Sequence, residues 1–434
     1  MKIAIIGSGG AGLTAAWLLQ DHHDITLFEK VNRLGGHADT VEVEQNGEIY
    51  PIDAGFEFFF DSMFIRFNRL LDLIGASVHK YPASATLYDT DHSRIVLLPP
   101  YGRSRVVWSG YRPQALSYLV QFQQVIARSI ALVDNGDPFI TAEQHFNALK
   151  LPNDFRDNFL IPFLLAEWCV ERDEFMTFSA YNVVKYVVAS RPKNPLQPIY
   201  ANEVVGGTQA YIKAMQAQLN RTKIKLAANI THLTETDDQF IVHDANSGAH
   251  SFDQVIIATS AIQASEYLQP FPWAEKYRAQ LDRIRYFKTT IAVHGDSRLM
   301  PKNPAHWSVV NTRFETTHSS NTIWKKWRSN QPVFRSWITY DKEMPTALYH
   351  IRTYDHLKIT LDHFRAQRSL VALQGENNFK EKKKNIWLAG LYMHDIDCHE
   401  SAIMSAVNIA QVLDPQSENL RLLMVQNQAG HSTH

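Results

Sequence analysis

Cysteine is scarce in this chain of 434 residues, which contains only Cys169 and Cys398. Two cysteines so far apart cannot build a disulfide framework or a CxxC relay, and they favour a reducing compartment or simple burial. The chain also lacks an apolar run of the ~20 residues that a membrane-spanning helix needs, and its short apolar start is no secretory signal. We therefore expect a cytoplasmic protein, and a peripheral contact with the inner face of a membrane stays open.

The chain has no excess of either sign of charge. Lys and Arg number 43 and Asp and Glu number 44, so the net charge is -1. A chain without a positive field attracts no polyanion, which disfavours nucleic acid as a partner. Its 45% of hydrophobic residues is typical of a globular protein, and its length predicts two domains.

A glycine-rich pattern follows the first apolar run. Ile3 to Ile6 predicts a strand buried on both faces, and Gly7 to Gly12 then satisfies GxGxxG at the start of an alanine-rich helix. In this pattern Gly7 makes the turn, Gly9 leaves room for a pyrophosphate, and Gly12 lets the helix pack on the strand. The predicted phosphate-binding residues are Gly7, Gly9, Gly10, Ala11 and Gly12, at a helix N-terminus that stabilises anions.

An acidic residue ends the second predicted strand. Residues 24 to 29 predict a second strand, and Glu29 ends it where a carboxylate can accept hydrogen bonds from ribose hydroxyls. Strand, loop, helix, strand and acid in this order predict a dinucleotide site, and a negative charge here disfavours a 2′-phosphate. The alternative is a glycine loop with an unrelated surface glutamate.

A second glycine pair distinguishes FAD from NAD. Gly35 and Gly36 lie just beyond Glu29, and Arg33 can supply charge-assisted hydrogen bonds to phosphates. A nicotinamide site needs no such loop, so the pattern favours FAD, although a plain Gly-Gly turn is the alternative. The cofactor-binding residues predicted here are Glu29, Lys30, Arg33, Gly35, Gly36 and His37.

Together the two motifs, GxGxxG and ExxxRxGG, resemble the FAD-dependent amine oxidase superfamily. The chain looks most like a bacterial branch of predicted NAD/FAD-binding proteins, through Gly390 to Ala410 and the segment from Ala292 to Asp296. The resemblance implies an α/β fold with a doubly wound Rossmann-type FAD-binding domain and a second α+β substrate domain. It also implies noncovalent FAD, because no cysteine motif for flavin attachment is present.

The same resemblance extends the site along the chain. Gly55 and Phe56 stand where the family usually has Asp-x-Gly-Gly beneath the flavin, so Phe56 makes that wall bulkier. The N-terminus of the last predicted helix would stabilise negative charge on the reduced ring. Further cofactor-binding residues implied by matching position are Ile230, Thr259, Gly390, Glu400, Ser401 and Ala402. Lys288 and His399 are the candidate catalytic residues, and no metal site is expected.

The predicted domains are discontinuous. The FAD-binding domain takes residues 1–75, 200–260 and 381–414, the substrate domain takes 76–199 and 261–380, and 415–434 form a tail. Within them we expect a hairpin over 39–50, helices over 114–133 and 142–168, and a meander from strands near 223–226, 230 and 240–242. Residues 324–328 and, more loosely, 103–108 mix aromatic and basic side chains as a lipid surface would, and a solvated face with buried rings is the simpler interpretation.

These features predict an FAD-dependent oxidoreductase that transfers a hydride between a substrate C–H or C=C group and the flavin. The resembling branch implies an unsaturated lipid acyl chain as substrate. Two alternatives stay open: an amine oxidase that produces peroxide, and a non-catalytic module that binds a dinucleotide.

Overall fold

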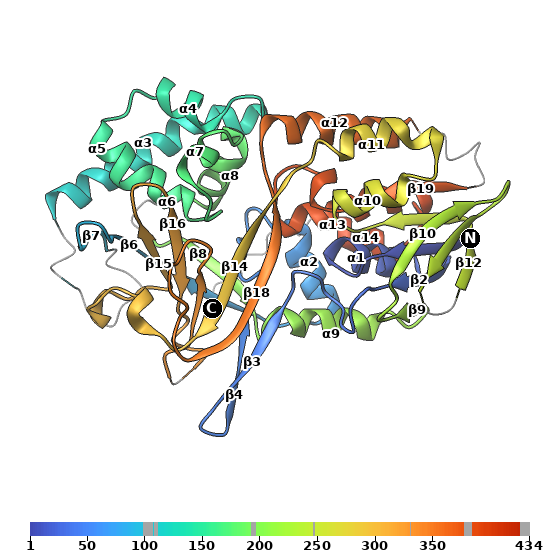
Figure 1. Ribbon diagram of the computed structural model, residues 1–434, viewed down its shortest axis with the longest axis horizontal. Helices are drawn as coiled ribbons and strands as arrows, with labels where there is room; N and C mark the ends of the chain where they lie inside the picture. Colours follow the sequence, from blue (N-terminus) through green and yellow to red (C-terminus); the bar gives the residue numbers. More distant parts are fainter. Residues whose placement is uncertain are drawn as a thin grey trace.

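The computed structural model describes residues 1–98, 107, 112–191, 197–245, 248–329, 331–376 and 384–425. Apart from Val107, the basic and aromatic stretch from Arg103 to Trp108 lies outside these residues. Figure 1 shows two units side by side, joined by long strands that run between them. Among the described residues, no helix has the length and apolar character needed to cross a bilayer.

The first unit is built on a five-stranded sheet in which every neighbouring pair is parallel. The strand order is β19 (Asn385–Leu388), β13 (Gln254–Ile257), β1 (Lys2–Ile6), β2 (Asp24–Phe28) and β9 (Thr222–Lys225). The strands β1, β13 and β19 are almost entirely buried, as apolar runs in a parallel sheet should be. The predicted doubly wound α/β unit is therefore confirmed.

Helices and a small antiparallel sheet cover this parallel sheet. Five helices pack on one another beside it (Figure 1): α1 (Gly10–Leu19), α2 (Ile65–Ile74), α9 (Thr208–Gln218), α13 (His399–Leu413) and α14 (Glu418–Met424). The meander consists of β10 (Ile230–Glu235), β11 (Phe240–Asp244) and β12 (Gly248–Phe252). The predicted place of residues 223–226 in the meander is wrong, because Thr222–Lys225 pairs in parallel with β2.

The second unit contains a seven-stranded sheet. Its order is β18 (Leu348–Leu357), β14 (Tyr286–His294), β17 (Phe334–Trp337), β16 (Ser319–Ile323), β15 (Val310–Phe314), β6 (Ala85–Asp89) and β7 (Arg94–Leu97). Its helices are α3 (Pro113–Asn135), α4 (Ala142–Ala148), α5 (Asn153–Phe155), α6 (Ile161–Leu165), α7 (Arg172–Met176) and α8 (Ala180–Ser190). The helix predicted over 142–168 is broken, because Pro152 starts a new turn and residues 156–160 form a π-helical turn.

The remaining elements connect the units. The predicted hairpin is confirmed as β3 (Thr40–Gln45) and β4 (Glu48–Asp53), which turn at Asn46 and Gly47, both with positive φ. A second pair joins β5 (Val78–Pro82) to β8 (Tyr200–Val204). Helices α10 (Ala261–Leu268), α11 (Glu275–Leu281) and α12 (Leu361–Gly375) lie beside the parallel-sheet unit in Figure 1, although the sequence places them in the substrate domain. The predicted tail contributes α14, whose Leu420 and Leu423 are buried.

Candidate functional site

The loop between β1 and α1 shows what each motif glycine does. A Cβ on Gly12 would lie 1.9 Å from the Gly7 carbonyl oxygen, and one on Gly7, where φ is +102°, would lie 2.6 Å from the Ala258 carbonyl oxygen. These two glycines are therefore required by the fold itself. A Cβ on Gly9 would meet nothing within 4 Å. Gly9 is thus the position at which the loop leaves space for a ligand.

The N-terminus of α1 can receive an anion. Gly9 is its N-cap, and among the described residues no side chain caps the first turn. Gly36, in the second glycine pair, approaches so closely that its Cβ would lie 3.2 Å from the Gly9 Cα. The two glycine loops therefore meet at the end of a helix with free N–H groups, an arrangement that binds phosphates.

Glu29 lies beside this loop at the end of β2. Its Oε2 accepts a hydrogen bond from the Ser8 N–H at 3.0 Å and another from the Ser8 hydroxyl, and its Oε1 accepts from the Val31 N–H at 3.0 Å. The carboxylate is therefore fixed beside the loop that joins β1 to α1, the candidate phosphate loop. An adenosine ribose in this position would meet an oriented acceptor, so the arrangement fits a dinucleotide.

Arg33 binds its own loop. Its guanidinium donates to the carbonyl oxygens of Gly36 at 2.9 Å and Ala38 at 3.2 Å, and it pairs with Asp39 at 3.1 Å. It thus shapes the second glycine loop. Lys30 is exposed, and its contact with the cofactor remains a prediction. The ring of His37 lies 5.1 Å from that of Tyr354 and 6.1 Å from that of His356, both on β18.

His399, the first residue of α13, lies against the phosphate loop. A Cβ on Gly10 would be 2.6 Å from its ring, which stacks on Phe56 at 4.6 Å and hydrogen-bonds to the Tyr211 hydroxyl at 2.9 Å. Desolvation lowers the pKa of His399 to about 4, so the ring is neutral at pH 7. The structure therefore brings together the first loop, Phe56 and the N-terminus of α13.

Glu400 serves a different local purpose. Its two oxygens accept hydrogen bonds from the backbone N–H groups of Arg66 at 2.7 Å and Phe67 at 2.8 Å, which are in the first turn of α2. The carboxylate thus caps α2. Ser401 donates to the Ile396 carbonyl oxygen at 2.6 Å, and the buried Ala402 follows it. The roles predicted for these three residues toward a cofactor stay predictions.

Two of the other predicted cofactor residues, Thr259 and Gly390, follow neighbouring strands at the same edge of the parallel sheet. Thr259 follows β13, and its methyl group would be 3.3 Å from a Cβ on Gly7. Gly390 follows β19 with φ +141°, and its N–H donates to the Ser405 hydroxyl at 2.9 Å. A Cβ on Gly55 would be 2.0 Å from the His37 carbonyl oxygen, so a side chain is excluded there. Ile230 begins β10, just after Ala228 donates to the Glu29 carbonyl oxygen.

Lys288 does not lie with the candidate cofactor residues. It is exposed on β14 opposite Asp355, whereas the neighbouring pairs Phe287 with His356 and Thr289 with Tyr354 occupy the other face. That other face meets the first unit, because the Tyr354 hydroxyl donates to Asp39 at 3.0 Å. The catalytic role of Lys288 remains a prediction without a supporting contact.

Several residues of the site were not predicted from the sequence. They are Ser8, Asp39, Phe67, Tyr211, Tyr354 and His356. Ser8 was within the motif but occupies a variable position, Asp39 closely follows the second glycine loop, and the others come from distant elements. Only the strand register of β14 and β18 places Tyr354 and His356 beside His37, so no local signal identifies them. His356 is desolvated, which lowers its pKa to about 3.

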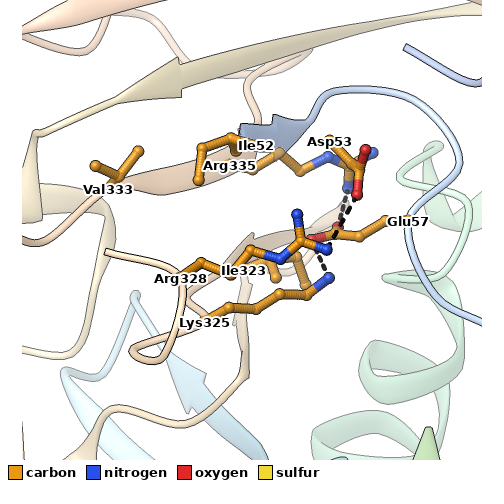
Figure 2. Close-up of a pocket in the computed structure, with 8 residues that line it drawn as sticks. All are labelled: Ile52, Asp53, Glu57, Ile323, Lys325, Arg328, Val333 and Arg335. Atoms are coloured by element: carbon orange, nitrogen blue, oxygen red, sulfur yellow. Dashed lines mark ion pairs between the residues drawn. The ribbon is translucent and has the colours of Figure 1, made fainter. Parts of the chain in front are cut away.

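Figure 2 shows a cavity with charged wall residues, one of which, Arg335, donates to the Gly55 carbonyl oxygen of the candidate site. It is lined by Ile52, Asp53, Glu57, Ile323, Lys325, Arg328, Val333 and Arg335. Residues 324–328 are interpreted from the sequence as a lipid surface or as a solvated face. Both interpretations are wrong for Lys325 and Arg328, which line the cavity. Only 5% of the Lys325 side chain and 7% of the Arg328 side chain are exposed, and both form buried ion pairs.

The comparisons with known proteins agree with this geometry. A family of NAD(P)-binding Rossmann-like domains matches residues 5–73, which confirms the predicted Rossmann-type fold of this segment. No curated protein matches the sequence.

Solved structures match over nearly the whole chain. A CLA-producing fatty acid isomerase from P. acnes has a TM-score of 0.66 at 15% identity, covering 95% of this chain and 98% of that one. Cyclohexylamine oxidase from Brevibacterium oxydans IH-35A gives 0.64 at 14% identity, covering 95% and 99%. Wild-type putrescine oxidase bound to putrescine gives 0.61 at 13% identity, covering 95% and 99%. At these identities the similarity establishes a shared fold, and this fold agrees with the resemblance to the amine oxidase superfamily.

Proposed function

We propose that this chain is an FAD-dependent oxidoreductase that moves a hydride between a substrate C–H or C=C group and noncovalently bound flavin. One observation carries the proposal. The open space at Gly9 lies between the uncapped N-terminus of α1 and the second glycine loop, with Glu29 fixed beside it. The acid at the end of β2, the open position at Gly9 and the N-terminus of α1 together fit the adenosine diphosphate half of FAD.

The chain's own residues would bind and orient the cofactor. Glu29 would hold the adenosine ribose, and the N–H groups at Gly10 and Ala11 would hold the phosphates. Flavin, when bound, supplies the hydride acceptor or donor. The N-terminus of α13, which also has no side-chain cap, would favour negative charge nearby, and the neutral ring of His399 stacked on Phe56 would exclude water there.

For the substrate we propose an unsaturated acyl chain. The fatty acid isomerase with the same fold supports this class. Reduction or bleaching of the flavin by an unsaturated fatty acid, and not by an amine, is the expected result.

One observation favours an amine substrate as the second candidate. The Glu167 carboxyl has no ion pair within the described residues, and desolvation raises its pKa to about 7. An ammonium group would supply the missing positive partner. Bleaching of the flavin by an amine, with peroxide released in air, would select this candidate, and a Glu167→Gln variant should then raise KM.

Gly9→Val is the sharpest test of the dinucleotide site. The backbone at Gly9 has φ −68°, which any residue adopts, and the new side chain would point into open space. The variant should therefore fold with nearly unchanged thermal stability and yet lose affinity for FAD by at least about tenfold, measured by fluorescence titration.

Gly375→Val is a matched control, because Gly375 also faces open space but ends α12, away from the loop. It should leave FAD affinity unchanged. A wild-type protein that binds no added FAD, or a Gly9→Val variant that binds it as well as the wild type, would contradict the proposal.

A further inference from the structure

A buried cluster of six charged side chains joins the two units. Its acids are Asp53, Glu57 and Glu203, and its bases are Lys325, Arg328 and Arg335. No side chain in the cluster is more than 7% exposed. The acids and the bases are equal in number, so their formal charges cancel. Figure 2 shows Asp53, Glu57 and the three bases converging.

The acids and the bases come from different parts of the fold. Asp53 ends β4 and Glu57 lies four residues later, next to the segment that carries Gly55 and Phe56. The bases lie between β16 and β17 or within β17, in the seven-stranded sheet. Every ion pair in the cluster therefore links the seven-stranded sheet to β4, β8 or the segment that follows β4.

The ion pairs form a connected network. Lys325 Nζ lies 3.0 Å from Glu57 Oε1 and 2.9 Å from Glu203 Oε2. Arg328 lies 2.9 Å from the same Glu203 oxygen and 3.6 Å from Asp53 Oδ2. Arg335 lies 3.8 Å from Glu57 Oε2.

The two guanidinium groups also hold the backbone next to the candidate cofactor site. Arg335 donates to the carbonyl oxygens of Ala54 at 3.4 Å and Gly55 at 3.2 Å. Arg328 donates to the Pro51 carbonyl oxygen at 2.8 Å. Charge-assisted bonds of this kind fix a backbone more firmly than neutral ones do.

The segment held in this way leads directly to the ring that meets the phosphate loop. The Phe56 N–H donates to the His37 carbonyl oxygen at 2.9 Å, and the Phe56 ring stacks on His399, which lies against Gly10. A contiguous path thus runs from Arg335 through Gly55 and Phe56 to His399.

Stability alone does not explain so many buried charges. Removing charged groups from water costs several kcal/mol per ion, and well-packed apolar residues often stabilise a fold at least as well. We propose that Arg335 and Arg328, with Lys325, are positioning residues that fix segment 51–57 from the substrate unit. They would thereby hold Phe56 and His399 in place against the loop between β1 and α1. Only the expected effect of these residues on FAD binding rests on the proposed function.

The test compares Arg335→Met with a matched control. Arg313 pairs with Asp341 through two bonds of 2.8 Å in the same sheet, far in sequence from the 51–57 segment. Arg313→Met therefore removes an ion pair of the same kind without touching the segment. Arg335→Lys keeps the charge but loses the guanidinium, whose Nη2 donates to both carbonyl oxygens while its Nη1 lies near Glu57, and it serves if Arg335→Met fails to fold.

Two readouts are needed. In the absence of FAD, hydrogen exchange of a peptide covering 48–60 should become at least about tenfold faster in Arg335→Met, faster to a smaller extent in Arg335→Lys, and unchanged in Arg313→Met. In titrations with FAD, Arg335→Met should weaken binding by about tenfold relative to Arg313→Met.

The outcomes separate the two proposals. Equal exchange in Arg335→Met and Arg313→Met would overturn the positioning role, whatever FAD does. Faster exchange with unchanged FAD affinity would overturn the link between the segment and the cofactor. If the wild type binds no FAD, the proposed function fails, and hydrogen exchange alone decides whether the cluster positions the segment.

Discussion

At the scale of single residues, His399 is the group whose charge is most constrained by the candidate site. Phe56 and Phe67 pack on its ring, Tyr211 bonds to its Nε2, and His37 adds a like charge that opposes protonation. These surroundings lower its pKa to about 4. The folded protein therefore binds a proton at His399 only at a pH well below that at which the unfolded chain does.

This difference predicts a contribution of His399 to the pH dependence of stability. The contribution is complete above the unfolded pKa of 6.5 and is lost as the pH falls toward 4, because the unfolded state then binds the extra proton. At pH 5 the loss amounts to about 2 kcal/mol at most. His399→Phe should therefore lose less stability than the wild type between pH 7.5 and pH 5, measured by urea unfolding.

The control for this prediction is Tyr211→Phe, which removes the hydrogen bond but keeps the imidazole. It should keep the pH dependence of the wild type, since desolvation is the main cause of the lowered pKa. Parallel stability curves for His399→Phe and the wild type would contradict a neutral, desolvated His399.

At the scale of elements, α2 depends on a side chain more than 300 residues away in the sequence. Its N-cap, Phe64, provides no side-chain bond, and the Glu400 carboxylate accepts from the N–H groups of Arg66 and Phe67 instead. This bond fixes α13 against α2 and so orients the N-terminus of α13 at the candidate site. It is a helix cap supplied by another helix.

Glu400→Ala should therefore destabilise the fold by about 1–2 kcal/mol, as the loss of a good N-cap does. The measurement is urea unfolding at pH 7. Glu44→Ala, at an exposed position of β3, is the control and should leave the unfolding midpoint unchanged. A Glu400→Ala midpoint equal to that of the control would show that α2 does not need this cap.

Sequence reasoning succeeded where the signal is local. The order of strand, glycine loop, helix and Glu29 depends on neighbouring residues, and the structure has the predicted elements there, with Glu29 beside the loop. It was less informative for Arg33, whose guanidinium binds carbonyl oxygens of its own loop, and for Glu400, whose partners lie on α2. Both outcomes depend on tertiary contacts that residue spacing does not encode.

The same contrast holds for whole elements. Residues 222–225 have an ordinary strand pattern, and only their parallel pairing with β2 places them in the large sheet. The cations at 325 and 328 look like surface residues by composition, and their acidic partners come from positions 53, 57 and 203. No window of sequence contains both halves of that cluster.

At the scale of the whole molecule, the nucleotide-binding unit is assembled from distant parts of the chain. β1 is flanked by β2 and by β13, and β2 is flanked by β9, so three of the five strands of the sheet come from beyond residue 220. The helix α1 packs mainly on α13, which begins at His399. The segment that carries both glycine motifs thus contributes only two strands and leaves both of their outer edges to others.

A fragment of residues 1–75 should therefore fail to fold or bind FAD, although it contains the whole of the family match over residues 5–73. Alone it would expose the edges of β1 and β2 and the buried faces of α1 and α2, and a two-stranded pair cannot bury them. The expected result is a far-UV circular dichroism signal without a cooperative thermal transition, and no FAD binding. The full chain, treated in the same way, should show a cooperative thermal transition and should bind FAD. A cooperative transition in the fragment would mean that its own hairpin and helices make a sufficient core, and that the strands from beyond residue 220 extend the unit without being needed to form it.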